Sequence, residues 1–285
     1  MFWFLVAKLY SSIYGFFIGK LNISLRGLGY ILRKLNRDHI IEVDGKKLFL
    51  NHKVASCYER LINGVYNEPE THLFLKALID KIDSSVTFVD VGANVGEMIV
   101  DIARYDKVEH VVGFEPHPEC AAACRKSIKL NRFENVILIQ KVLSDSRKYV
   151  SFEFDSVSPN ASKITEKKDS MIEASTLDDE LGVFHGNCII LIDVEGAELK
   201  VVKGGKSFIQ KRRPLIVFEF NQVTKQHFRI DEMKDELGKD YRIYRLRRDD
   251  GRLDDKINDA WNCVAVHISS PFFGACSGLM HGSTA

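Results

Sequence analysis

The sequence has little of what marks a nucleic-acid-binding protein, a zinc protein or a disordered chain. Lysine and arginine number 40 and aspartate and glutamate 39, so the formal net charge is only +1 and offers no general excess of cations for phosphate contacts. None of the six cysteines stands in a CxxC pair, which argues against a structural zinc. We expect reduced thiols, as in cytosolic proteins. The hydrophobic fraction of 45% is enough for a sizeable core.

The amino-terminal segment is far more apolar and aromatic than the rest of the chain. Residues 2–19 contain one charged side chain, Lys8. They are barely long enough to cross a hydrocarbon layer, which needs about 20 residues, and a central lysine costs on the order of 3 kcal/mol there. We therefore expect residues 2–37 to lie on a membrane surface, with a spanning helix and a helix docked on the domain as alternatives. The cations that follow the apolar stretch place the rest of the chain in the cytoplasm, and they are Lys20, Arg26, Arg33, Lys34 and Arg37.

A small addition is expected between this segment and the main domain. Residues 40–51 alternate in hydropathy around an Asp-Gly pair at 44 and 45, a strong signal for a β-hairpin. Pro69 marks the start of an amphipathic helix that ends near residue 82. We therefore assign residues 1–38 to the membrane-associating segment and residues 39–85 to a hairpin and helix addition.

Residues 86–270 alternate short apolar runs with amphipathic stretches. The runs VTFVDV, HVVGFE, NVILIQ, CIILIDV and PLIVFEF have the continuous valine, isoleucine and phenylalanine content of parallel strands that are buried on both faces. Helices between them would supply the crossovers, so we predict an α/β fold with a doubly wound, mostly parallel sheet. Residues 149–154 are predicted as a further strand, 156–170 as a polar loop, 241–246 and 262–268 as a terminal strand pair, and 271–285 as a C-terminal tail.

The first of these runs ends in a glycine turn, Asp90-Val-Gly92-Ala-Asn94-Val-Gly96. Ligands of open α/β sheets bind where such a strand ends and a helix begins, and glycines allow a close backbone approach. The spacing differs from the dinucleotide fingerprint and lacks the Lys-Ser/Thr pair of a phosphate-binding loop. An aspartate just before the turn suits a ligand with an ammonium group, such as S-adenosylmethionine. A turn that only packs the helix on the strand is the alternative.

The second and third strands end in further candidate cofactor contacts. Glu115 stands 25 positions after Asp90, and an acid about 20 residues beyond the first loop usually accepts hydrogen bonds from an adenosine ribose. A solvent-facing acid is the alternative. After the third strand, Val142 is predicted to pack on the adenine and Ser144 or Asp145 to bond its edge, although a plain turn is equally compatible with the sequence.

Acidic side chains gather where the fourth and fifth strands end. Asp193, Glu195 and Glu198 lie within six residues, where mutual repulsion costs stability unless a cation, a proton or a substrate hydroxyl uses them. Glu198 is equally explained as a residue that favours the dipole of the following helix. Glu219 and Asn221 follow the fifth strand at the same edge. Together these residues predict a reaction site beside the cofactor turn.

Five segments, in this order, resemble the FkbM family of S-adenosylmethionine-dependent methyltransferases: FVDVGANVG, GFEPHP, STLDDEL, IDVEGAELKVVKGG and PLIVFEFN. The resemblance spans residues 86–267. It implies a class I methyltransferase fold, which is Rossmann-like, and transfer of a methyl group to an oxygen, commonly a sugar or polyketide hydroxyl. It also implies that Asp193 and Glu195 border the methyl-transfer site and that the cofactor is held by Asp90, Gly92, Asn94, Gly96 and Glu115.

Methyl transfer from a sulfonium is an in-line displacement, so the enzyme must align a hydroxyl oxygen with the methyl carbon and accept its proton. We predict Asp193 or Glu195 as the base and Glu219 as an orienting residue, without a metal. In an alternative, Asp193, Glu219 and Asn221 hold Mg²⁺. The expected acceptor is a hydroxyl-bearing glycan or small molecule, such as a lipid-linked or envelope glycan at the cytoplasmic face of a membrane.

Two other functions fit parts of the sequence. A nicotinamide-dependent oxidoreductase shares the doubly wound sheet but requires a third glycine at the dinucleotide spacing. A catalytically idle methyltransferase-like module that binds a membrane or a partner would explain residues 2–19. It does not explain why the acids at 90, 115, 193 and 195 occur together.

Overall fold

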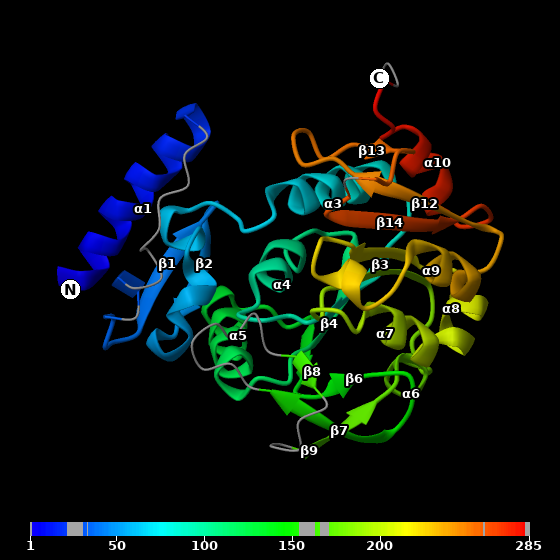
Figure 1. Ribbon diagram of the computed structural model, residues 1–285, viewed down its shortest axis with the longest axis horizontal. Coiled ribbons are helices and arrows are strands. Elements are labelled where there is room, and N and C mark those ends of the chain that lie inside the picture. Colours follow the sequence, from blue (N-terminus) through cyan, green and yellow to red (C-terminus); the bar gives the residue numbers. More distant parts are fainter. Residues whose placement is uncertain are drawn as a thin grey trace.

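The computed structural model describes residues 2–21, 31–32, 34–153, 163–165, 171–258 and 260–282. Its centre is an eight-stranded sheet in the order β13-β12-β14-β11-β10-β3-β4-β5 (Figure 1). The strands are β3 (Val86–Val91), β4 (Val108–Phe114), β5 (Val136–Ile139), β10 (Asn187–Ile192), β11 (Leu215–Glu219), β12 (Tyr241–Leu246), β13 (Leu253–Asp254) and β14 (Asn262–His267). Strands β5, β4, β3, β10 and β11 are mutually parallel, whereas β14 runs antiparallel between β11 and β12.

The doubly wound, mostly parallel sheet predicted from the sequence is therefore confirmed, with its terminal strand pair. All six residues of β3 are buried, as a central strand covered on both faces requires. Helices α3 (Pro69–Lys81), α4 (Glu97–Ile102) and α10 (Phe272–Ser277) contribute to the apolar layer on one face. Helices α6 (Leu177–Leu181), α7 (Glu198–Gly204), α8 (Lys206–Arg212) and α9 (Ile230–Leu237) contribute to the layer on the other. The chain order reverses between β3 and β10, where doubly wound sheets bind ligands.

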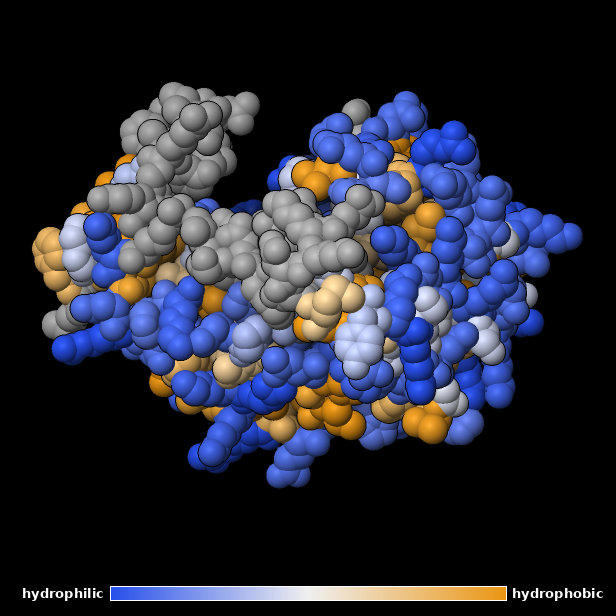
Figure 2. Space-filling view, turned by 60° about the horizontal axis from the view of Figure 1, so that its bottom comes forward, coloured by the Kyte–Doolittle hydropathy of each residue, from blue (hydrophilic) through white to orange (hydrophobic). Residues whose placement is uncertain are grey.

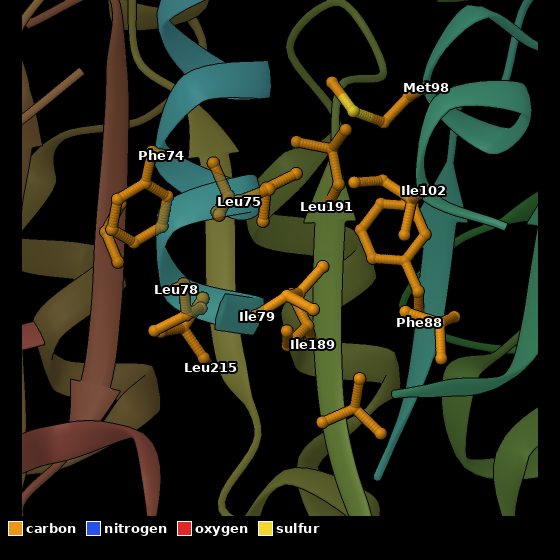
Figure 3. Packing of buried hydrophobic residues seen from close by; sticks show 14 of the residues in the cluster. Phe74, Leu75, Leu78, Ile79, Phe88, Met98, Ile102, Ile189, Leu191 and Leu215 are labelled. Carbon is orange, nitrogen blue, oxygen red and sulfur yellow. The ribbon is translucent and has the colours of Figure 1, made fainter. Parts of the chain in front are cut away.

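Helix α3 closes the first apolar layer. Leu75, Leu78 and Ile79 lie toward β10 and β11 (Figure 3), and these three side chains and Phe74 are each at most 1% exposed. The helix begins at Pro69, as predicted. Because its apolar side packs on the sheet, its first turn is fixed near the carboxyl ends of the strands.

The predicted hairpin is formed by β1 (His39–Val43) and β2 (Lys46–Leu50). Asp44 and Gly45 both have positive φ, 50° and 76°, as a two-residue type I′ turn requires. The hairpin packs on helix α5 (Pro118–Asn131), where the Phe49 amide donates a hydrogen bond to the Ser127 hydroxyl at 2.9 Å. The short helices η1 (His52–Tyr58) and η2 (Leu61–Asn63) then lead to α3.

Helix α1 (Phe2–Leu21) lies beside this hairpin (Figure 1). Phe4 stacks on His39 with the ring centroids 4.1 Å apart, and Ala7 is fully buried. The opposite side of α1 is apolar and exposed, with Phe2, Leu5, Leu9 and Ile13 between 42% and 69% accessible. One side of the amino-terminal segment is thus docked on the domain, as one of the sequence alternatives predicted, while the other side has no cover.

The described helices include none whose length and apolar character would suffice to span a membrane. Of the cations predicted to face lipid, Lys34 and Arg37 are exposed, whereas Arg26 and Arg33 lie outside the described residues. On the face shown in Figure 2, hydrophilic residues predominate among those coloured by hydropathy, and hydrophobic residues form scattered patches.

Two segments differ from the prediction. Residues 163–165, expected within a polar loop, form strand β8 (Lys163–Thr165), which pairs with β7 (Lys148–Glu153) in a four-stranded sheet completed by β6 (Val142–Leu143) and β9 (Met171–Ser175). The polar composition of the segment gave no sign of this strand, which is held by its pairing with β7. Residues expected as a tail include α10, whose Phe272 and Cys276 are buried in the core. All six cysteines are described, buried and free.

Candidate active site

A cavity of about 540 Å³ opens at the carboxyl ends of β3, β4, β10 and β11. It lies at the edge where open α/β sheets bind ligands, and its volume is that of a small-molecule site. The glycine turn after β3, the end of β4 and the loops after β10 and β11 line it, and the start of α3 contributes a further wall. The two groups of predicted site residues therefore meet in one cavity.

The wall of this cavity is strongly acidic. Its carboxylate side chains are Glu59, Glu68, Asp90, Glu97, Glu115, Asp193, Glu195 and Glu219. The cationic side chains of the wall are engaged elsewhere, because Arg60 donates to the Asn67 carbonyl at 2.7 Å and Lys141 pairs with Glu180 at 2.6 Å. Such a balance favours a ligand that carries positive charge and disfavours an anionic one.

The glycine turn presents two acceptors that lack donors. Asp90 is 2% exposed, and its Oδ2 atom has no hydrogen-bond partner among the described residues. Burial, together with the neighbouring Glu115 carboxylate, raises the pKa of Asp90 to about 7. Asn94, at a left-handed φ of 49°, also has a buried Oδ1 atom without a partner. Buried acceptors of this kind are costly unless a ligand supplies the donors.

Two glycines of the turn are required by the protein's own backbone. At Gly92, where φ is 97°, a Cβ atom would lie 1.8 Å from the carbonyl oxygen of Asp193. At Gly96, where φ is 85°, it would lie 2.5 Å from the Cys124 sulfur. Gly92 lines the cavity, whereas Gly96 packs the turn against α5 and does not. The turn thus touches the acidic loop directly, a contact that the sequence pattern did not predict.

Glu115 joins the turn to the end of β4. Its Oε2 atom accepts a hydrogen bond from the Asn94 amide at 2.7 Å, and its Oε1 atom accepts one from the His117 amide at 2.7 Å. Burial raises its pKa to about 7 despite these bonds. Each carboxylate oxygen retains a second lone pair, so Glu115, which lines the cavity, can still accept hydroxyl donors.

The remaining predicted cofactor residues are divided. Val142 lines the cavity, but Ser144 and Asp145 are not part of its wall. Ser144 is fully buried, and Asp145 accepts hydrogen bonds from Ser144 and Ser146 and pairs with Lys148. The short strand β6, which pairs with β9, contributes Val142 and Leu143 to the wall, and the two polar side chains that follow it are not among the lining residues.

The predicted reaction residues Asp193, Glu195 and Glu219 all line the cavity. Asp193 follows β10 and Glu219 ends β11, and the register of these two parallel strands makes their ends neighbours. Burial and the nearby carboxylates of Glu195 and Glu198 raise the pKa of Glu219 to about 8. Burial and Glu219 likewise raise the pKa of Asp193. Glu195 has a left-handed φ of 54°, a strained conformation typical of functional loops.

Glu198 and Asn221 hold this group in place. The Oε1 atom of Glu198 accepts hydrogen bonds from the Val194 and Gly196 amides, both at 3.1 Å, and so orders the loop that carries Asp193 and Glu195. The Asn221 amide donates to Glu219 Oε1, while its own oxygen accepts from the Val223 and Thr224 amides. Asn221 therefore orients Glu219, and its oxygen is committed to backbone donors.

Sequence reasoning missed two cavity residues at the start of α3. Glu68 accepts hydrogen bonds from the Asn262 amide at 2.7 Å and from the Trp261 indole at 3.2 Å. His72 has its Nδ1 atom 2.5 Å from an Asp101 oxygen. Both residues precede the segment in which chemistry was expected. An acid before a helix-starting proline is equally typical of an ordinary helix start, so the sequence carried no distinguishing signal.

Comparisons with known proteins find one matching family and several similar solved structures. Residues 90–243 match the family described as the methyltransferase FkbM domain, whereas no curated protein matches the chain. The solved FkbM methyltransferase of Methylobacillus flagellatus KT is 18% identical with a TM-score of 0.48, over 76% of this chain and 53% of that one. TYW2 of M. jannaschii, solved with AdoMet, is 15% identical with a TM-score of 0.45, over 86% and 88%. An rRNA methylase of Streptococcus thermophilus is 12% identical with a TM-score of 0.42, over 72% and 100%.

The matched part of the Methylobacillus protein is about half of its length. The family match takes in more than half of the present chain and includes both the glycine turn and the acidic loop. It also extends through β11, whose last residue lines the cavity, and through α9 into β12. The chain therefore belongs to the FkbM family of methyltransferases.

Proposed function

We propose that this methyltransferase transfers a methyl group from S-adenosylmethionine to a hydroxyl of a neutral acceptor, such as a sugar of a glycan or a related small molecule. One observation carries the proposal. The same cavity holds two groups: buried acceptors of the glycine turn that have no hydrogen-bond donor among the described residues, and the carboxylates at the ends of β10 and β11. The first group suits a cofactor with ammonium and hydroxyl donors. The second suits an acceptor whose hydroxyl must be oriented and deprotonated.

The residues of the turn fit S-adenosylmethionine, the cofactor that family membership implies. Asp90 Oδ2 and Asn94 Oδ1 are buried acceptors without donors, and they would receive the ammonium group. Glu115 has free lone pairs for the ribose hydroxyls, and Val142 offers an apolar contact for the adenine. When bound, the cofactor supplies an electrophilic methyl group on a cationic sulfur. The acidic wall would attract that positive charge.

We infer that the acceptor carries no negative charge, because the wall of the cavity is strongly acidic. A phosphorylated or carboxylated acceptor would meet the carboxylates of Asp193, Glu195 and Glu219 at close range. A hydroxyl, in contrast, donates to a carboxylate and can pass its proton to it as the oxygen attacks. We assign the role of base to Asp193 or Glu195 and an orienting role to Glu219, which Asn221 fixes in turn.

Membrane association is proposed on separate grounds. Helix α1 docks through Phe4 and Ala7 and leaves Leu5 and Leu9 uncovered on its other side. An exposed apolar helix face with cations nearby is the pattern of a segment that lies in the interface of an anionic membrane, and Arg37 is among the exposed cations. We infer that the enzyme meets a lipid-linked or envelope glycan at such a surface.

Isothermal titration calorimetry of the full-length protein tests the cofactor assignment. S-adenosylhomocysteine should bind saturably and NAD should not compete with it. Glu115→Ala should weaken binding by about 30-fold, because a buried charged acceptor of hydroxyl donors is lost. Glu109→Ala is the matched control, since Glu109 lies exposed on the same strand. An unchanged affinity in Glu115→Ala, or binding of NAD alone, would contradict the assignment.

The acceptor is then sought with labelled S-adenosylmethionine and fractionated envelope glycans. Label that mild base does not release, and that co-migrates with a neutral sugar, would support transfer to a hydroxyl oxygen. Label found only on carboxylates or amines would refute the O-methyl assignment while leaving the methyltransferase intact.

A further inference from the structure

Three carboxylates converge where β10 and β11 end. One oxygen atom each of Asp193, Glu198 and Glu219 lies within 4.8 Å of the other two. They come from different elements, because Asp193 follows β10, Glu198 begins α7 and Glu219 ends β11. Two of the three, Asp193 and Glu219, also line the cavity, whereas Glu198 lies beneath it and is fully buried.

This cluster has oxygens that no donor of the described chain satisfies. Glu198 Oε2 and Glu219 Oε2 are buried without a hydrogen-bond partner among the described residues, and their side chains are 0% and 6% exposed. The other oxygen of each is held by fixed donors, the Val194 and Gly196 amides for Glu198 and the Asn221 amide for Glu219. Two of the three converging carboxylates thus each carry one unsatisfied oxygen and are held in place through the other.

The cationic side chains that line the cavity in the described part of the chain do not neutralise these three carboxylates. Of the cationic side chains of the cavity wall, Arg60 and Lys141 bond to Asn67 and Glu180, and His72 pairs with Asp101 and Glu97. Three like charges at this separation, two of them with buried and unsatisfied oxygens, cost stability unless protons or a cation bind. Oxygen ligands on a rigid backbone are the donor set that hard divalent cations take.

We propose that Asp193, Glu198 and Glu219 bind a hard divalent cation of the Mg²⁺ class, and that the acceptor hydroxyl coordinates it from the cavity. The second part rests on the proposed function, whereas the first does not. Glu198 would be the buried ligand, and Asp193 and Glu219 would face the acceptor. Asn221 is excluded as a ligand because its oxygen already accepts two backbone hydrogen bonds; it fixes Glu219 instead.

A bound cation would allow the acidic wall of the cavity to bind oxygen atoms of the acceptor. Mg²⁺ keeps several positions for water or substrate oxygens when proteins supply only a few carboxylates. Vicinal hydroxyls of a sugar can occupy two such positions, which would hold the acceptor oxygen in a defined place and make its proton easier to remove. The proton would pass to Glu195, which lines the same cavity. A polyhydroxylated acceptor is therefore favoured over an isolated alcohol.

The test is calorimetric titration of chelator-treated, full-length protein with MgCl₂, and with MnCl₂ followed by electron paramagnetic resonance. We expect one saturable ion per chain. Glu198→Gln and Asp193→Asn should each lower the affinity for the ion by roughly tenfold to a hundredfold. Gln at 198 keeps an oxygen for the Val194 and Gly196 amides, so the loop should still fold. Glu109→Gln, on the exposed side of β4, is the control and should bind the ion normally.

Thermal unfolding provides a second readout and separates this proposal from the proposed function. At one Mg²⁺ concentration, the Tm of the wild type and of Glu109→Gln should rise by more than that of Asp193→Asn. If S-adenosylhomocysteine binds the metal-free protein while neither Mg²⁺ nor Mn²⁺ binds at millimolar concentration, the cation site is wrong and the methyltransferase assignment stands. If the ions bind and S-adenosylhomocysteine does not, the cation site stands and the proposed function is wrong. Equal affinity for the ions in Glu198→Gln, Asp193→Asn and the wild type would also overturn the proposal.

Discussion

The stability of this protein should depend on pH through a buried histidine beside the cavity. His72 is 5% exposed, and it contacts Asp101 at 2.5 Å and Glu97 at 3.3 Å. Tyr66 stacks on its ring, and Lys46 pairs with the other oxygen of Asp101. Burial opposes the charge on His72, but the hydrogen bonds to the two carboxylates outweigh it and raise its pKa to about 8. The folded protein thus holds a proton that the unfolded chain releases near pH 6.5.

The magnitude follows from that difference in pKa. Each pKa unit corresponds to about 1.4 kcal/mol, so a histidine that titrates at about 8 when folded contributes about 2 kcal/mol to the free energy of unfolding. This contribution is fully present below pH 6.5 and is lost as the pH rises through 8. Asp90 and Glu115, whose pKa values burial raises to about 7, also favour the folded state less as the pH rises. The contribution of His72 must therefore be measured as a difference.

The contribution of His72 to the free energy of unfolding can be measured by urea unfolding of the wild type and of His72→Gln at pH 6 and pH 9, without cofactor. The wild type should be more stable than the variant at pH 6, and the gap should narrow by about 2 kcal/mol at pH 9. His110→Gln, exposed on β4, should follow the wild type at both values. A gap that stays constant or widens with pH would show that His72 is neutral in the folded protein, and the charge cluster would have to be reassigned.

Three other predictions follow from the geometry of the site and of α1. Gly92→Ala should destabilise the fold by about 3 kcal/mol or more in urea unfolding, because its Cβ would lie 1.8 Å from the Asp193 carbonyl oxygen at a strained φ; a near-neutral effect would mean that the two loops separate easily. Glu195→Gln should keep S-adenosylhomocysteine binding but lower turnover on the identified acceptor by about 10²–10⁴-fold, and normal turnover would move the base to Asp193. Leu9→Asp should release the protein from anionic vesicles in flotation, whereas Ile40→Asp, at another exposed apolar site, on the hairpin, should not. Equal flotation of both variants would argue against α1 as the contact.

The sequence was most informative where the chain is continuously apolar. The runs that became β3, β10 and β11 could be placed because a parallel strand buried on both faces leaves few polar positions. The site residues at their carboxyl ends followed from that placement. Strand β8 was missed because three residues in a polar stretch pair only through β7. Periodicity within a segment does not report such long-range pairing.

The cavity also contains residues that no local pattern could indicate. Glu68 bonds to Trp261 and Asn262, nearly two hundred positions away, and its neighbours become visible only once α3 is packed on the sheet. Ser144 and Asp145 differ from Val142 in this respect. Their place after the third strand matched the expected adenine site, but they are not among the residues that line the cavity. Position along a strand end predicts a site residue only where the chain continues along that edge.

The contact between Gly92 and Asp193 explains why the two motifs of this chain belong together. The amide of Asp193 donates to the Val91 carbonyl at 2.9 Å, and its own carbonyl oxygen occupies the space that a side chain at 92 would fill. The glycine that lets the cofactor turn form is therefore also the residue that lets the acidic loop cross it. Because this contact is made by backbone atoms, the distance between the turn and the backbone of the acidic loop is set by the sheet. A methyl donor held by the turn and an acceptor held by the acids would thus meet in a geometry that the fold sets before either binds.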